Sequence, residues 1–190
     1  MRVIAGRFRS RKLAAPRGLK VRPTSDRLRE TLFNVLAAGP GPPLEGSAWL
    51  DLYAGSGAVG IEALSRGARQ VYFVEAARAA AQCIRANLKA LSLTQGFAVL
   101  EEDVLPALRR LDAQSAACDY VFLDPPYRET GAYEQTLRFL AGSKLLGPSS
   151  IVIAEHDRRF DPGDAVSRLR RFRRLDQGDT VLSFYKLESA

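Results

Sequence analysis

The chain has 190 residues, of which 46% are hydrophobic and 26% are charged, and its net charge is +7. Length and composition predict a soluble globular protein with one domain, or with one domain and a small appendage. The chain contains one histidine, His156, and two cysteines far apart in sequence, Cys83 and Cys118. So few ligands argue against a zinc or iron–sulfur site, and no metal is expected. Ser-His and Cys-His triad chemistry is equally unexpected.

The first residues and the apolar runs predict a cytoplasmic protein. The opening stretch, MRVIAGRFRSRKL, lacks the apolar core of a secretory signal. No apolar run approaches the length of a membrane span, so we expect no membrane partner. Two separate cysteines fit a reducing compartment. A monomer is the default expectation for the oligomeric state.

Positive charge is concentrated at the start of the chain. Residues 1–29 contain ten Arg or Lys residues and one acid, Asp26, which gives +9 and leaves −2 for the remaining 161 residues. A basic arm of this density favours a nucleic-acid backbone as partner, and a solvated surface without a partner is the alternative. The candidate nucleic-acid contacts in this region are Arg7, Arg9, Arg11, Lys12 and Arg27.

The first predicted elements are a basic arm and a helix. Residues 1–22 have no helical period and predict a short hairpin or an extended arm. Residues 25–38 predict a helix, because Ser25 is a candidate N-cap and apolar residues recur along one face. The sequence GPGPP at 39–43 ends this helix and predicts a linker.

After the linker, strands and helices alternate regularly. The predicted strands are 49–53, 71–74, 97–100, 120–123, 151–154, 169–175 and 180–187, and the predicted helices are 59–66, 76–91, 104–111 and 132–141. Alternation of this kind predicts an α/β, Rossmann-like fold with right-handed parallel units. The last two strands have no helical pattern between them, so we expect a seven-stranded, mostly parallel sheet closed by an antiparallel hairpin. The predicted domains are 1–38, a basic arm with the first helix, and 44–190, a single globular unit.

A glycine loop follows the first strand of this sheet. Residues 55–60 read Gly-Ser-Gly-Ala-Val-Gly, formally the G-x-G-x-x-G pattern of dinucleotide enzymes. Asp51 lies four residues before the loop, where a carboxylate disfavours an anionic pyrophosphate and favours a cation. S-adenosylmethionine is such a ligand, because it carries an ammonium and a sulfonium but no phosphate. The sequence therefore favours S-adenosylmethionine over a nicotinamide cofactor.

Acidic residues end the next predicted strands as well. Ligands of doubly wound sheets bind at the carboxyl ends of the strands. There, Glu75 is placed to accept hydrogen bonds from the ribose hydroxyls of the cofactor. Asp103 is placed to accept one from the adenine amino group, with Val104 beside the adenine ring. The predicted cofactor-binding residues are Asp51, Tyr53, Ala54, Gly55, Ser56, Gly57, Glu75, Asp103 and Val104.

The motif Asp124-Pro-Pro-Tyr127 ends a fourth predicted strand. The exocyclic amino group of a base is a poor nucleophile, because its lone pair is delocalised into the ring. Two acceptors on its N–H bonds can stabilise the charge that grows during methyl transfer. Asp124 is one predicted acceptor, the Pro125 carbonyl is the second, and Tyr127 offers a stacking face. Pro126, between them, is assigned to the base or RNA.

These motifs together resemble a known family. The glycine loop with Asp51, Glu75, Asp103 and the Asp-Pro-Pro-Tyr motif resembles the class I amino-methyltransferases. The block Arg22-Pro-Thr-Ser-Asp-Arg-Leu-Arg-Glu-Thr-Leu-Phe-Asn34 and the stretches 3–6 and 62–68 look like the bacterial 16S rRNA guanine-N2 methyltransferases, the RsmD family. This resemblance implies methylation of the guanine numbered 966 in small-subunit rRNA, with Asp124 as catalytic acceptor. It also implies that Arg22 and Thr24 lie near the cofactor or the RNA.

Several other functions remain possible at this point. DNA adenine-N6 and cytosine-N4 methyltransferases use the same Asp-Pro-Pro-Tyr motif to bind the target amine. They usually carry a larger target-recognition region, for which 190 residues leave little room. A protein-glutamine methyltransferase would not need the basic arm. An NAD-dependent oxidoreductase is opposed by Asp51 and leaves the second motif unexplained. A non-catalytic rRNA assembly factor on the same fold is the alternative outside enzymes.

Overall fold

The computed structural model describes residues 1–16, 25–126 and 129–188. Its helices are η1 (Gly6–Phe8), α1 (Asp26–Ala37), α2 (Ala58–Ser65), α3 (Arg78–Ala90), α4 (Val104–Ala113) and α5 (Thr130–Gly142). Its strands are β1 (Ala48–Leu52), β2 (Gln70–Val74), β3 (Phe97–Leu100), β4 (Cys118–Leu123), β5 (Leu146–Asp157), β6 (Ala165–Val166), β7 (Leu169–Gln177) and β8 (Thr180–Leu187).

All these strands join one sheet in the order β3-β2-β1-β4-β5-β8-β7-β6. The first five strands of this order are parallel to one another, and β8 pairs antiparallel with both β5 and β7. The mostly parallel sheet with a closing hairpin is therefore confirmed. The predicted count of seven strands is wrong, because the described residues form eight. The additional strand, β6, has two residues, too few for any periodicity in the sequence to reveal it.

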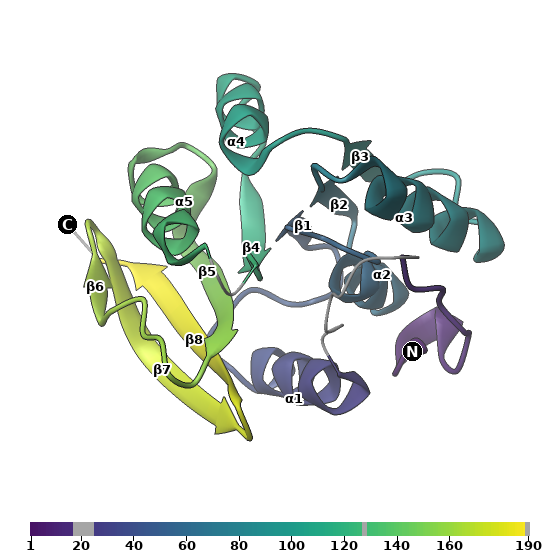
Figure 1. Ribbon diagram of the computed structural model, residues 1–190, viewed down its shortest axis with the longest axis horizontal. Helices are drawn as coiled ribbons and strands as arrows, with labels where there is room; N and C mark the ends of the chain where they lie inside the picture. The colour runs from purple at the N-terminus through teal and green to yellow at the C-terminus, as the bar shows by residue number, and fades with distance from the viewer. Residues whose placement is uncertain (17–24, 127–128, 189–190) are drawn as a thin grey trace.

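Helices cover both faces of the sheet (Figure 1). Successive side chains of a strand point to opposite faces, so each strand contributes to two cores. Trp49 of β1 packs with apolar residues of α1, α2 and α3, whereas Leu50 and Leu52 pack with α4 and α5. All five residues of β1 are buried, as expected for a central parallel strand. This arrangement leaves the carboxyl ends of β1, β2 and β4 as neighbours at one edge.

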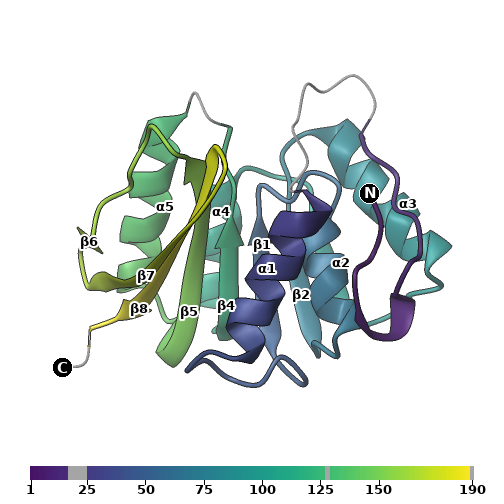
Figure 2. The same cartoon turned by 90° about the horizontal axis from the view of Figure 1, so that it is seen from below.

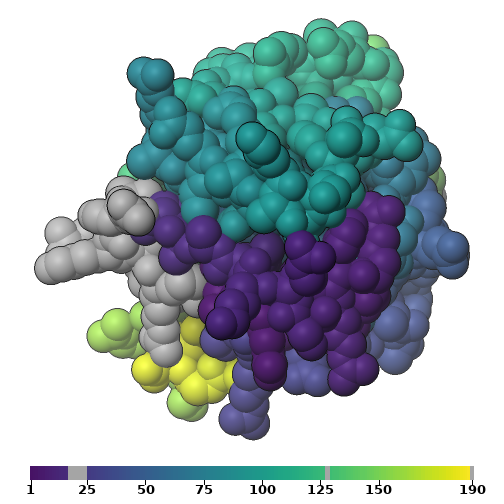
Figure 3. Space-filling model, turned by 90° about the vertical axis from the view of Figure 1, so that its right-hand side faces the viewer, coloured from purple at the N-terminus to yellow at the C-terminus, as the bar shows by residue number. Residues whose placement is uncertain are grey.

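The first residues form a hook along the side of the molecule. Backbone bonds from Val3 N–H to Arg11 O (2.9 Å) and from Leu13 N–H to Met1 O (3.1 Å) close a hairpin around η1. Figures 2 and 3 show this hook, in purple, lying along the side of the molecule that carries α2 and α3. Val3 and Leu13 are buried in the same core as α2. We call residues 1–16 the N-terminal hook.

The first long helix begins where the sequence predicts. The Ser25 side chain accepts a hydrogen bond from Leu28 N–H at 3.1 Å, which is the bond of an N-cap. The apolar residues Leu28, Leu32, Phe33 and Leu36 of α1 are buried against the sheet. No helix in the described ranges is long and apolar enough to cross a membrane.

Candidate active site

The carboxyl edge of the sheet brings the predicted acids together. Asp51 lies one residue before the end of β1, and Glu75 and Asp124 directly follow the neighbouring strands β2 and β4. Asp103 lies three residues beyond the end of β3. The carboxylates of Glu75 and Asp124 are close enough to that of Asp51 to repel it. The edge therefore carries a group of carboxylates that face a common region.

Asp51 holds the glycine loop to the end of β1. It is 2% exposed, and its Oδ2 accepts a hydrogen bond from Gly60 N–H at 2.9 Å. Gly60 allows this contact, because a Cβ there would lie 2.3 Å from the Phe73 ring. Burial, and to a smaller degree the Glu75 carboxylate, raise the pKa of Asp51 to about 8, although the bond from Gly60 acts in the opposite direction. The site therefore favours a positive charge beside Asp51.

Glu75 joins the end of β2 to the same loop. Its Oε2 accepts from Gly55 N–H and its Oε1 from Ala77 N–H, both at 2.8 Å. Each carboxylate oxygen has two acceptor positions, so both oxygens keep capacity for a second donor. The geometry is compatible with the predicted contact to ribose hydroxyls, and this role stays a prediction.

Tyr53 and Ala54 connect β1 to the loop. Ala54 N–H donates to Val74 O at 3.0 Å, which ties the connection to β2. Tyr53 has a φ of +58°, an uncommon left-handed conformation for a tyrosine. Its hydroxyl lies 3.3 Å from the Thr136 hydroxyl on α5. Burial raises the pKa of Tyr53, so its hydroxyl stays protonated. Tyr53 therefore bridges the glycine loop and the helix that follows the second motif.

Asp103 and Val104 start the helix α4. Asp103 occupies the N-cap position, but its side chain makes no capping hydrogen bond and is exposed. Val104 is 7% exposed and packs with the α4–α5 core. An exposed carboxylate beside a buried apolar residue is compatible with an adenine contact, which also stays a prediction.

Asp124 has a second acid beside it that the sequence analysis missed. Residues Leu123 and Ala154 are register partners on the parallel strands β4 and β5, so Asp124 and Glu155 follow at the same level. Glu155 is only 3% exposed. Burial, then the Glu155 carboxylate and then that of Asp51 raise the pKa of Asp124 well above its usual range. A signal was available, because Ile-Val-Ile-Ala-Glu155 repeats the pattern of an apolar run followed by an acid.

The two prolines of the motif differ in exposure. Pro125 is buried, whereas Pro126 is exposed and its carbonyl accepts from Glu129 N–H at 2.8 Å. This bond starts the turn into α5. Tyr127 lies outside the described residues, as do Arg22 and Thr24. The Pro125 carbonyl as second acceptor therefore stays a prediction.

The predicted basic contacts lie mainly on the N-terminal hook. Arg7, Arg9, Arg11 and Lys12 are all exposed or partly exposed, and so is Arg27 on α1. The Arg7 guanidinium lies 4.5 Å from the centre of the Phe8 ring, and Arg11 donates to Ala90 O at 2.8 Å. No ion pair involves these five cations within the described ranges. Their charge is therefore available to an external anion.

The arginines of the C-terminal hairpin, residues 168–174, are arranged differently. Arg171 pairs with Asp161 at 2.6 Å, and Arg174 pairs with the same carboxylate at 2.9 Å. Arg170 pairs with Glu188 at 2.7 Å. Much of the positive charge in this cluster is thus neutralised within the protein, which fits a structural role better than RNA binding.

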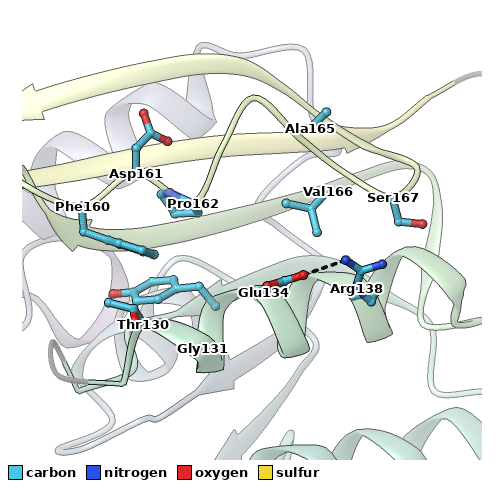
Figure 4. A pocket seen from close by; sticks show the side chains of 11 residues that line it. Thr130, Gly131, Glu134, Arg138, Phe160, Asp161, Pro162, Ala165, Val166 and Ser167 are labelled. Carbon is cyan, nitrogen blue, oxygen red and sulfur yellow. Dashed lines mark hydrogen bonds and ion pairs between the residues drawn. The ribbon is translucent and has the colours of Figure 1, made fainter.

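A groove of about 430 Å³ lies between α5 and residues 160–167 (Figure 4). Thr130, Phe160 and Pro162 lie at one end, and an ion pair between Glu134 and Arg138 (2.7 Å) crosses its floor. None of the predicted site residues lines this groove. Its charged lining residues are Glu134, Asp161 and Arg138, and the only cation among them is already paired with Glu134, so we assign the groove no part in RNA binding or in the site.

With this geometry in place, comparison with known proteins identifies the family. A family model described as "Conserved hypothetical protein 95" matches residues 1–186. The chain belongs to this family. "Ribosomal RNA small subunit methyltransferase D" of Escherichia coli K12 is 37% identical over 157 residues, covering 83% of this chain and 75% of that protein. YlbH of Bacillus subtilis is 37% identical over 186 residues, covering 98% of both chains. The resemblance to the RsmD family is thereby confirmed.

Solved structures agree with this assignment. The Escherichia coli protein yhhF superposes with a TM-score of 0.82 at 33% identity, covering 100% of this chain and 99% of that one. SMU.776, solved with S-adenosylhomocysteine, has a TM-score of 0.65 at 16% identity, covering 84% of this chain and 49% of that one, and therefore shows the fold alone. The fold is that of S-adenosylmethionine-dependent methyltransferases, as predicted, and the predicted cofactor agrees with it.

Proposed function

We propose that this chain transfers a methyl group from S-adenosylmethionine to the N2 amino group of a guanine in small-subunit rRNA. The observation that supports this most strongly is the group of carboxylates at the carboxyl edge, with Asp51 and Glu75 on the glycine loop and Asp124 beside them. The names of the relatives support rRNA of the small subunit as substrate. Guanine 966 is the proposed target, and the proposed enzyme is a cytoplasmic monomer.

The glycine-loop side of the site would hold the cofactor. Bound S-adenosylmethionine supplies a methyl group on a cationic sulfur, which leaves as a neutral thioether. Asp51 would pair with its ammonium group, and this pairing would favour the ionised form of the buried carboxylate. Glu75 would accept hydrogen bonds from the ribose hydroxyls, and Asp103 would accept one from the adenine amino group. Rigid placement by these contacts provides much of the catalysis, because the leaving group is already activated.

The Asp124 side of the site would hold the target amine. Asp124 and the Pro125 carbonyl would each accept a hydrogen bond from one of the two N–H groups of the amine. These two bonds direct the nitrogen lone pair toward the methyl carbon. When the N–C bond forms, the C–S bond breaks and its electron pair stays on sulfur. The nitrogen, now positively charged, loses one proton to the Asp124 carboxylate. A raised pKa suits Asp124 to receive that proton.

Methyl transfer to three substrates tests this proposal. The protein is incubated with labelled S-adenosylmethionine and, in parallel, small ribosomal subunits, naked small-subunit rRNA or duplex DNA. We expect label in the subunits or the rRNA, recovered as N2-methylguanosine after digestion. Label in DNA, or in a methylated adenine or cytosine, would contradict the proposal. A paired target base would also have to leave its stack, so an unpaired guanine should react fastest.

Charge removal on the N-terminal hook tests the proposed RNA contact. Replacing Arg7, Arg9 and Arg11 by Gln should lower rRNA affinity. It should also make the plot of log binding constant against log salt concentration less steep, by about 0.7 for each phosphate that the protein no longer neutralises. The matched control removes the same charge elsewhere by replacing Arg109, Arg168 and Arg173, which are also exposed and form no ion pair within the described residues, unlike Arg170. Equal decreases in the two variants would show that the hook has no special part in RNA binding.

A further inference from the structure

Asn87 lies at the centre of a contact between the N-terminal hook and the glycine loop. It is 3% exposed and belongs to α3. Its Nδ2 donates to Ser56 O in the loop at 3.0 Å and to Ala14 O in the hook at 3.1 Å. Its Oδ1 accepts from Ala14 N–H at 2.8 Å. One buried side-chain amide thus joins two segments that belong to different predicted functions.

The other end of the hook reaches the same loop residue. The Ser56 hydroxyl lies 3.5 Å from the sulfur of Met1, within the distance of a weak O–H···S hydrogen bond. Ser56 is 8% exposed. The loop residue between the two glycines Gly55 and Gly57 is therefore held from two sides by the hook, once directly and once through Asn87.

The hook is also fixed to the helix that follows the glycine loop. Glu62 of α2 is fully buried and accepts from Ile4 N–H at 2.7 Å and from Ala5 N–H at 3.0 Å. The Ser65 hydroxyl accepts from Phe8 N–H at 3.0 Å. Gly6 permits this close approach, because it has a φ of +78° and a Cβ there would lie 1.9 Å from Ser65 O. The hook therefore moves with α2 and is not an independent extension.

We propose that Asn87 is a positioning residue that ties the glycine loop to the N-terminal hook, so that cofactor and RNA favour each other's binding. A buried amide that loses its partners leaves unsatisfied polar groups, so the loop conformation and the hook conformation support one another. RNA that stabilises the hook in this conformation also stabilises the loop that is joined to it, and the coupling is reciprocal by thermodynamic necessity. The RNA half of this inference rests on the proposed function, whereas the loop half does not.

Calorimetry with S-adenosylhomocysteine, which cannot react, tests both halves. Asn87→Ala should lower the affinity for S-adenosylhomocysteine about ten-fold without RNA, because the loop loses one hydrogen bond and its anchor. Naked small-subunit rRNA should raise this affinity about five-fold or more in the wild type. In the variant the increase should fall toward none. Asn87→Asp keeps the acceptor for Ala14 N–H and removes both donors, so it should show the same decreases if Asn87→Ala does not fold.

A matched control separates positioning from general destabilisation. Leu88→Val makes a small cavity on the same helix, because Leu88 is 1% exposed. It should lower the melting temperature but leave the effect of rRNA on cofactor affinity unchanged. Unaltered S-adenosylhomocysteine affinity in both Asn87 variants would overturn the inference, whatever the substrate is. An rRNA effect absent from the wild type would overturn the coupling, whereas failure of the proposed function would appear separately as no methyl transfer to rRNA.

Discussion

The carboxyl edge of the sheet carries two pairs of acids that are held in different ways. Asp51 and Glu75 accept hydrogen bonds from backbone N–H groups of the glycine loop and the turn after β2. Asp124 and Glu155 lie at the same level of two neighbouring strands, and burial and the neighbouring carboxylates all raise the pKa of Asp124. The first pair is fixed by backbone donors, with Asp51 also buried, whereas the second pair is distinguished by two neighbouring carboxylates at the same level of adjacent strands.

This difference indicates how one edge serves two ligands. A carboxylate that already accepts an N–H bond is oriented, and it gains most from a ligand that brings a permanent positive charge. Asp51 and Asp124 both have a raised pKa: at Asp51 a bound cation would lower it again, whereas at Asp124 it suits a group that receives hydrogen bonds and then a proton from an amine. The glycine-loop side thus fits the cofactor and the Asp124 side fits the target base.

The largest effect is expected from Asp124→Asn, which leaves the shape of the site unchanged. The amide cannot accept both the hydrogen bond and the proton of the amine, so the transfer rate should fall about 100- to 1000-fold. Affinity for S-adenosylmethionine should change little, because the cofactor contacts lie on the other pair. Single-turnover transfer to rRNA and calorimetry of the cofactor measure the two quantities.

The control for this variant is Asp179→Asn, which alters an exposed carboxylate in the turn between β7 and β8. It should transfer methyl groups at the wild-type rate. A near wild-type rate in Asp124→Asn would show that the two pairs do not differ in the proposed way.

Asp51→Asn should have the next largest effect, and with opposite signs on binding and stability. Cofactor affinity should fall about 10- to 100-fold, because the ammonium loses a charged acceptor. The folded-state pKa of Asp51 is raised from 3.8 to about 8, so wild-type stability decreases as pH rises between these values. The variant lacks this decrease, so its melting temperature relative to wild type should increase from pH 5 to pH 8. A constant difference across that range would show that Asp51 is ionised in the free protein.

The strand-end acids could be predicted because each follows a short apolar run. Asp51, Glu75 and Asp124 all occupy such positions, and parallel strands place them at one edge. Glu155 follows the same pattern, directly after the predicted strand 151–154, but no motif around it indicates a function. In the structure β5 continues through Glu155 to Asp157, so this acid lies inside a strand.

The contact between hook and glycine loop could not be predicted from the sequence. Asn87 and Ala14 are 73 positions apart, and a single asparagine in a helix carries no signal of its partner. Composition identified the basic residues of the hook but suggested an arm separate from the catalytic unit. The buried positions of Val3 and Leu13 instead join it to the core of α1, α2 and α3. Two apolar residues among many cations were too weak a pattern to predict this packing.

The smallest expected effect is that of Glu155→Gln, which should displace the pH profile of the methyl-transfer rate. This variant tests directly whether Asp124 and Glu155 act as a pair. Methyl transfer requires ionised Asp124, whose pKa is raised, so the wild-type rate should decline as pH falls through that raised value. Removing the Glu155 charge removes one of the two carboxylates that face Asp124, while the other, Asp51, remains. The rate at saturating cofactor and rRNA should therefore persist to lower pH than in the wild type.

The control for this displacement is Glu134→Gln, which removes an equal charge from the exposed side of α5 and should leave the profile unchanged. Glutamine at 155 keeps the shape and much of the hydrogen-bonding capacity of glutamate, so packing alone would not move the profile. An unmoved profile would mean that Glu155 does not act on Asp124 and that burial and the Asp51 carboxylate account for its raised pKa. Asp124 and Glu155 would then not work as a pair, and the distinction between the two sides of the edge would reduce to the N–H bonds of the glycine loop.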